Sequence, residues 1–67
     1  MEKRFNVFIV EDSTRKAVSL IGENLREDKA ELREETGWRK VDTNRFTPVS
    51  VEVGSDKDKK FQKDLEK

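Results

Sequence analysis

Few residues in this 67-residue chain have side chains suited to covalent or acid–base chemistry. Histidine, cysteine and tyrosine are all absent, which removes the most common general base, the thiol nucleophile and the phenolic acid. One spacing, Ser13-x-x-Lys16, matches the serine–lysine pair of some acyl-transfer enzymes. Because a four-letter match in a polar segment has little specificity, we interpret both residues as ordinary turn residues.

Metal and phosphate sites are poorly supported by the remaining residues. The adjacent carboxylates of Glu11 and Asp12 could hold Mg²⁺, but acidic pairs of this kind are more often solvated turn residues. Zinc prefers cysteine and histidine ligands, which the chain lacks. The three glycines, Gly22, Gly37 and Gly54, are isolated, and each follows an expected element as a terminator. We therefore expect no metal ion, no cofactor and no enzymatic activity.

The composition indicates a small folded domain with a very polar surface. Charged residues make up 45% of the chain and hydrophobic residues 31%, and 15 basic side chains balance 15 acidic ones. The apolar residues cluster in a few segments, which favours a folded body over disorder. A net charge of zero provides no general attraction to nucleic acids or membranes, so any such binding would need a local patch.

The expected compartment follows from the absence of cysteine and of a long apolar segment. Small secreted domains are usually rich in disulfides, and this chain has none to form. The apolar run near the N-terminus covers only about six residues, too few for a signal-peptide core or a membrane span. We expect a cytoplasmic protein that does not bind membranes, and its size and charge suit a small bacterial or phage accessory protein.

The first expected element is a strand over residues 4–10, which is rich in β-branched and aromatic side chains. Successive side chains of a strand point to opposite faces of the sheet. The odd-numbered residues of this segment would therefore share one face, and the even-numbered residues Asn6, Phe8 and Val10 the other.

Two interpretations compete for residues 17–21. They form either a second strand, paired with the first as a hairpin, or part of a longer helix that reaches Thr36. Apolar residues at a spacing of three and four favour the helix, but Gly22 in its interior would cost about 1 kcal/mol. Asn24 and Glu27 have the spacing of a capping box, which would start a helix at Leu25. We prefer the hairpin.

A helix over residues 25–36 is expected under either interpretation, because the segment consists largely of good helix formers. Gly37 is placed to end it as a C′ residue, with Trp38 folded back onto the last turn as a buried contact. A further strand over residues 46–53 should follow, with Val49, Val51 and Val53 facing inward.

These elements predict an α+β fold, a two-layer β-β-α-β sandwich with one helix on one face of a three-stranded antiparallel sheet. The sheet order would be 2-1-3. Residues 1–54 would form the single domain, and residues 55–67 a charged C-terminal tail that is disordered or a frayed helix. Within that tail, Phe61 and Leu65 are the only apolar residues.

Acidic residues concentrate in the expected helix. The segment 23–35 has six acidic and three basic side chains. A run of this kind is usually a solvated helix face. The functional alternative is an acidic surface that docks a basic partner.

The second face of the expected sheet has no helix left to cover it, so Phe8 would lie on an open surface unless Phe46, Trp38 or Phe61 buries it. Exposed apolar patches mark protein interfaces. The candidate interaction surface combines this face with nearby basic and aromatic residues: Arg4, Asn6, Phe8, Val10, Arg15, Lys16, Trp38 and Arg45.

The expected function is therefore a non-enzymatic interaction module. It would bind a protein partner, or a second copy of itself as a homodimer, through the open sheet face or a strand edge. The alternative is a weak nucleic-acid-binding protein that uses aromatic stacking and a local basic patch. That patch would comprise Arg4, Arg15, Lys16, Arg39, Lys40 and Arg45 around Trp38 or Phe8.

Overall fold

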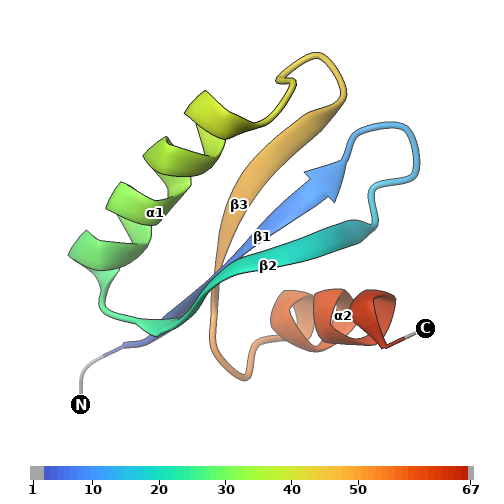
Figure 1. The fold of residues 1–67 in the computed structure, drawn as a ribbon. Helices are drawn as coiled ribbons and strands as arrows, with labels where there is room; N and C mark the ends of the chain where they lie inside the picture. Colours follow the sequence, from blue (N-terminus) through green and yellow to red (C-terminus); the bar gives the residue numbers. More distant parts are fainter. Residues whose placement is uncertain (1–2, 67) are drawn as a thin grey trace.

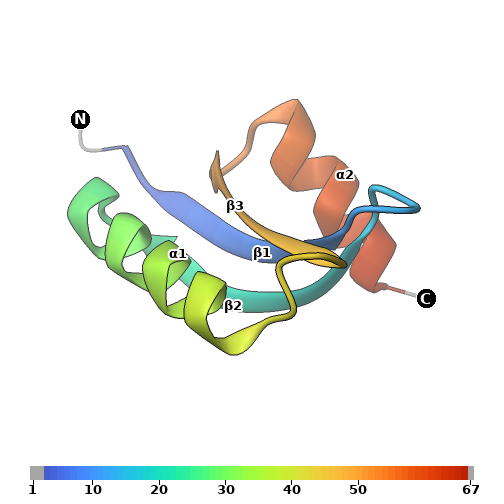
Figure 2. The same cartoon turned by 90° about the horizontal axis from the view of Figure 1, so that it is seen from above.

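The computed structural model describes residues 3–66, and its sheet lies between two helices (Figures 1 and 2). Residues 1, 2 and 67, at the outer ends of the expected domain and tail, lie outside the described residues. The elements in chain order are β1 (Phe5–Glu11), β2 (Ala17–Leu25), α1 (Glu27–Lys40), β3 (Phe46–Glu52) and α2 (Asp56–Leu65). None of the helices formed by residues 3–66 is long and apolar enough to cross a membrane.

The antiparallel sheet confirms the hairpin and the predicted strand order. The strands are arranged β2-β1-β3, and β1 pairs with both neighbours in antiparallel orientation. Residues 17–21 therefore belong to a strand, and the helical alternative for them is wrong. The hairpin closes where the Glu11 N–H donates to the Lys16 carbonyl at 2.9 Å. Central placement suits β1, whose residues 6–10 are all buried.

Strand β2 follows β1 irregularly. Phe5 pairs with Leu25 at one end and Val10 with Ala17 at the other, with three register shifts between them. Such bulges add residues to one strand, bend it and disturb its hydrogen-bonding edge. The strand continues past Asn24, whose backbone has a positive φ of 53°, so the predicted capping box is wrong. Helix α1 begins instead after Arg26, which makes no side-chain capping bond.

Helix α1 continues past Gly37, which corrects the predicted helix end. A Cβ at Gly37 would lie 3.0 Å from the Ile21 Cδ1 and 3.0 Å from the Pro48 Cγ. This glycine therefore permits close packing of α1 on β2 and β3, and its role is not that of a C′ residue. Trp38, one residue later, leaves the packed side of the helix and is 43% exposed. The expected burial of Trp38 on the last turn is not observed.

Of the two alternatives for the charged tail, the structure has a helix, α2, packed on the sheet, so residues 3–66 form two helices and three layers and not the predicted two-layer sandwich. Gly54 turns the chain after β3 with a φ of 85°, and Ser55 caps the helix by accepting a hydrogen bond from the Asp58 N–H at 3.3 Å. A helix of ten residues is marginal by itself in water. Packing against the sheet supplies the missing stability, because Phe61 is buried and Leu65 partly buried there.

The sheet separates the core into two halves. The half under α2 is the cluster Phe8, Val10, Ala17, Val51 and Phe61. The half under α1 receives the other face of β1, including the buried Val7 and Ile9. Val53, expected to face inward, lies beyond the end of β3 and is largely exposed.

Candidate protein-interaction surface

The predicted open sheet face is closed in the structure. Asn6 is 3% exposed, Phe8 0% and Val10 8%, because α2 covers this face of the sheet. The three residues therefore belong to the interior, and their predicted place on an exposed interaction surface is wrong. Of the covers considered for Phe8, Phe61 is the one found, with the two ring centroids 5.2 Å apart.

A buried polar network joins α2 to the sheet. The Asn6 side-chain amide donates to the Asp58 Oδ1 at 2.7 Å, and the Gly54 N–H donates to the Asp58 Oδ2 at 2.9 Å. The Asn6 Oδ1 accepts from the Asn24 N–H at 2.8 Å. Each polar group thus has a partner, as buried polar groups require. The hydrogen bond from the Asn24 N–H therefore links the left-handed backbone at Asn24 to the buried side chain of Asn6.

The carboxyl group of Asp58 is held in its ionised form by this network. Burial alone raises the pKa of Asp58, but hydrogen bonds from the Gly54 N–H and from the side chains of Asn6 and Gln62 lower it by more. The net result is a pKa below the ordinary value for aspartate. Because all of these partners lie within the fold, we interpret Asp58 as a structural residue.

The basic candidates fall at two ends of the molecule. Arg15 and Lys16 lie in the β1–β2 turn and Arg45 precedes β3. These two loops meet where the Asp12 N–H donates to the Arg45 carbonyl at 2.9 Å. Arg4 lies at the other end, just before β1. The eight predicted interaction residues therefore do not form one surface.

The two adjacent carboxylates, of Glu11 and Asp12, both accept hydrogen bonds from threonine hydroxyls. Glu11 accepts from the Thr14 hydroxyl at 2.9 Å, and Asp12 accepts from the Thr47 hydroxyl at 2.7 Å. Within residues 3–66 there is no group of three or more acidic, histidine or cysteine side chains arranged to hold a metal ion.

Neither edge of the sheet is well suited to pairing with an added strand. Hydrogen bonds of Asp12 with Arg45 and of Val53 with Arg4 fix which residues of β3 bond to β1. The backbone nitrogen of Pro48 therefore points away from β1, toward the free edge, although its ring is buried. Proline has no N–H to offer an added strand. The other edge belongs to β2, which has the three register shifts. Such features protect natural sheet edges against further pairing.

An acidic groove runs along the β3 side of α1, and the sequence indicated it only as a local excess of acids. It consists of three hollows of about 480, 200 and 320 Å³. The hollows adjoin one another, since Glu31 lines all three, Glu27 lines the first two and Glu34 lines the last two. We use the name acidic groove for the surface lined by Phe5, Glu27, Glu31, Glu34, Glu35, Trp38 and Ser50. Its first hollow is also lined by Asp28 and by two basic residues, Lys3 and Arg26, so the acidic excess is greatest toward Trp38.

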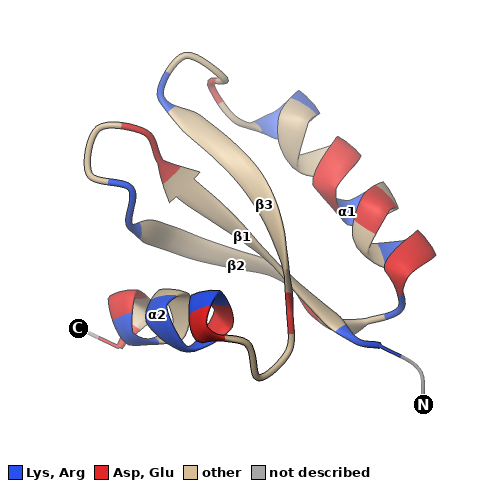
Figure 3. Cartoon of the chain, turned by 180° about the vertical axis from the view of Figure 1, so that it is seen from behind, with Lys and Arg blue, Asp and Glu red and all other residues tan. Residues whose placement is uncertain are grey.

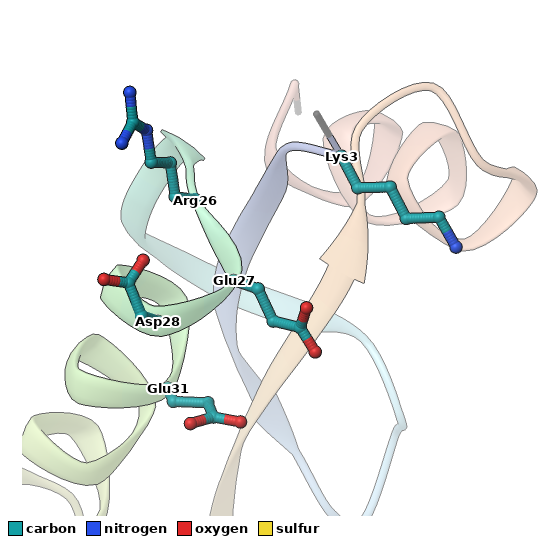
Figure 4. Close-up of a pocket in the computed structure, with 5 residues that line it drawn as sticks. All are labelled: Lys3, Arg26, Glu27, Asp28 and Glu31. Carbon is teal, nitrogen blue, oxygen red and sulfur yellow. The ribbon is translucent and has the colours of Figure 1, made fainter. Parts of the chain in front are cut away.

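The geometry of the groove follows from helix periodicity and from one hydrogen bond. Glu27 and Glu31 are four residues apart, which places them on one side of a helix, and Figure 4 shows both side chains extending the same way. Asp28 extends in a different direction in the same view. Glu34 accepts a hydrogen bond from the Ser50 hydroxyl at 2.7 Å, which ties α1 to β3 at the groove floor.

The far end of the groove is aromatic. Trp38 lines the third hollow together with Glu31, Glu34 and Glu35. An exposed indole beside carboxylates offers a stacking face for a cation and a hydrophobic contact for an aliphatic stem. Trp38 is the one predicted interaction residue that lies in the groove. It was expected as a buried contact on the last turn of the helix, and it is exposed because the helix continues past Gly37 to Lys40.

No family model, curated protein or solved structure matches this chain.

Proposed function

We propose that the protein is a non-enzymatic interaction module that binds a basic segment of a partner protein in the acidic groove of α1. The observation that supports this function is a row of four glutamates along three adjoining hollows, the last of which places Glu31, Glu34 and Glu35 beside the exposed Trp38. Arginine- and lysine-rich segments complement such a surface in charge, which speeds encounter and selects partners. Tryptophan is among the residues that most often dominate binding energy at interfaces.

The size of the groove suggests the size of its ligand. From Glu27 to Trp38 the helix rises about 16 Å, at roughly 1.5 Å per residue. An extended peptide covers about 3.3 Å per residue, so about five peptide residues match the length of the groove. The proposed ligand is therefore a short, extended segment with lysine or arginine at several positions.

The chain has a single tryptophan, so its fluorescence reports directly on the groove. We expect a lysine- and arginine-rich pentapeptide to change the emission of Trp38 in a saturable manner, and an acidic peptide of the same length to leave it unchanged. The variant Glu31→Lys with Glu35→Lys should weaken binding at least about tenfold, the size typical of losses at interface hot spots.

A matched control makes the same charge change elsewhere. Glu23 and Asp56 are exposed and lie outside the groove, and Glu23→Lys with Asp56→Lys should bind the basic peptide with nearly normal affinity. Equal weakening by both pairs would show a general charge effect and would contradict a groove-specific site.

Nucleic-acid binding is the second candidate, supported by the gathering of Arg15, Lys16 and Arg45 at the end of the molecule where α1 also ends (Figure 3). Phe8 is buried and offers no stacking face. Binding of this kind should weaken steeply with salt, because phosphate contacts release counterions. Unchanged anisotropy of labelled single-stranded RNA at low salt would exclude this candidate.

A further inference from the structure

The outward side of α2 is basic, although its sequence has nearly equal numbers of lysines and acids. Asp58 is buried in the polar network, and Asp64 is partly buried with its carboxylate accepting from the Ala17 N–H at 3.2 Å. Two of the three acids are thus turned toward the sheet, and the third, Asp56, is exposed at the start of the helix. We call the exposed lysines of this helix the lysine face: Lys57, Lys59, Lys60 and Lys63.

The lysine face has no apolar component of its own. The apolar residues of α2, Phe61 and Leu65, are packed against the sheet. A helix that lies in a membrane interface needs a free apolar side to bury among the lipids. The lysine face therefore fits a surface of carboxylates or phosphates, and it has no free apolar side with which to insert into a lipid bilayer.

The acidic groove and the lysine face are on opposite sides of the same molecule. Figure 2 shows α1 and α2 separated by the sheet, and Figure 3 shows that each helix has both basic and acidic residues. The hollows beside α1 and the burial of residues along α2 decide which charges each surface presents. The two surfaces cannot meet within one chain. With 15 basic and 15 acidic side chains, two copies have no net repulsion to overcome, and a protein of near-zero net charge associates more readily.

We propose that the lysine face of one copy docks in the acidic groove of a second copy. The partner of the groove in the proposed function is then another molecule of this chain, and this inference depends on that function. The spacing of the charges supports the match, because Lys59 and Lys63 are four residues apart, as are Glu31 and Glu35. Both pairs therefore repeat at about 6 Å along their helices, and two lysines can face two glutamates in register.

The contact is heterologous, since each copy contributes a different surface. The first copy retains a free groove and the last a free lysine face, so association grows stepwise with concentration unless a ring closes. Ion pairs exposed to solvent are individually weak and are screened by salt. The assembly is therefore weak, concentration-dependent and salt-sensitive.

Sedimentation velocity over a range of concentrations tests this inference. The weight-average mass of the wild-type chain should rise with concentration at about 20 mM salt and return to that of the monomer at about 0.5 M, where the Debye length is short. Lys59→Glu with Lys63→Glu should remain monomeric at low salt, and so should Glu31→Lys with Glu35→Lys. All four residues are exposed, and circular dichroism should show an unchanged fold for each variant.

The variant with all four substitutions is the decisive one. Its net charge is zero again, and the two pairs proposed to meet, 31 with 35 and 59 with 63, are complementary with their signs exchanged. Glu27, Glu34, Lys57 and Lys60 keep their charges. Association should therefore return, in contrast to both double variants. A control with the same change of net charge as the lysine-face variant, Lys40→Glu with Arg45→Glu, alters exposed residues outside both surfaces and should still associate.

Three results would overturn the inference. They are a strictly monomeric wild-type chain at low salt, association that survives reversal of either surface, and failure of the fourfold variant to associate. Binding of the lysine face to single-stranded RNA, without self-association, would identify a different partner and would also overturn it. If the chain stays monomeric while the basic peptide still binds near Trp38, the proposed function stands and only the identity of the partner is wrong.

Discussion

The ring of Phe61 in α2 lies 5.2 Å from the ring of Phe8 in β1, tilted by 58°. This tilted arrangement is one that aromatic pairs favour. The contact joins the last helix of the chain to its first strand and completes the half of the core that β1 presents on that side. Helix α2 is consequently part of the folded body, and several consequences can be measured.

Replacing Phe61 with alanine should destabilise the protein by about 3–5 kcal/mol, the usual cost of removing a buried phenylalanine. Urea denaturation followed by circular dichroism measures this loss. Lys57→Ala, at an exposed position of the same helix, should change stability by less than about 0.5 kcal/mol. A Phe61→Ala protein as stable as the wild type would mean that α2 does not pack on Phe8 in solution.

Asp58→Asn should lower stability by about 1.5–3 kcal/mol at neutral pH, the range for hydrogen bonds to a charged group. The amide retains the size of the side chain but cannot accept from both Gly54 and Asn6 as the carboxylate does. Chemical denaturation at pH 7 gives the difference. Asp56→Asn, at an exposed position two residues earlier, is the matched control and should have little effect.

Stability should also fall in acid because of Asp58. Its pKa is lowered in the folded state, so its contribution is complete above the unfolded-state pKa of about 3.9 and is lost as the pH falls through the folded-state value. A pH series from 7 to about 2 measures this loss, and Asp58→Asn should have a smaller acid-dependent loss than the wild type. Identical slopes for the two proteins would contradict the assignment.

Gly37→Ala should destabilise the protein, although alanine is the better helix former by about 1 kcal/mol. The new Cβ would lie 3.0–3.1 Å from two atoms of the Pro48 ring, which is rigid, and overpacking of this kind costs about 1–3 kcal/mol. Thermal unfolding compares Gly37→Ala with Thr36→Ala, which alters the neighbouring residue. An increase in melting temperature for Gly37→Ala would show that α1 has room to move away from β3.

Trp38→Ala should leave the fold intact and weaken binding. With 43% of its surface exposed, the indole should contribute about 1 kcal/mol or less to stability, whereas loss of a binding hot spot costs about tenfold or more in affinity. Anisotropy of a labelled basic peptide measures binding without tryptophan. Leu32→Ala, at another exposed apolar position of α1, should bind normally, and equal losses for both variants would place the peptide outside the groove.

Local sequence patterns were sufficient for the sheet. The β-branched and aromatic residues of β1, the polar turn after it and the alternation around Val49 and Val51 led to the correct strand order, β2-β1-β3. These features depend on short-range rules of strand propensity and alternation, which operate before any long-range contact forms. The excess of acids over residues 23–35 was likewise visible in the sequence, since charge is a property of composition.

The tertiary structure decided the features that depend on contacts between distant residues. Helix α2 forms because Phe61 and Leu65 can pack on an apolar face of the sheet. A helix of ten residues would be only marginally stable without this packing. Gly37 lies inside α1, where its lack of a side chain lets Pro48 and Ile21 approach closely. Asn24 belongs to β2, and its backbone N–H donates to the Asn6 side chain, so it does not cap a helix. These contacts bury Phe8 and leave Trp38 exposed, and so they decide where the candidate surface lies. The physical reason is that packing energy outweighs local conformational preference when the two disagree.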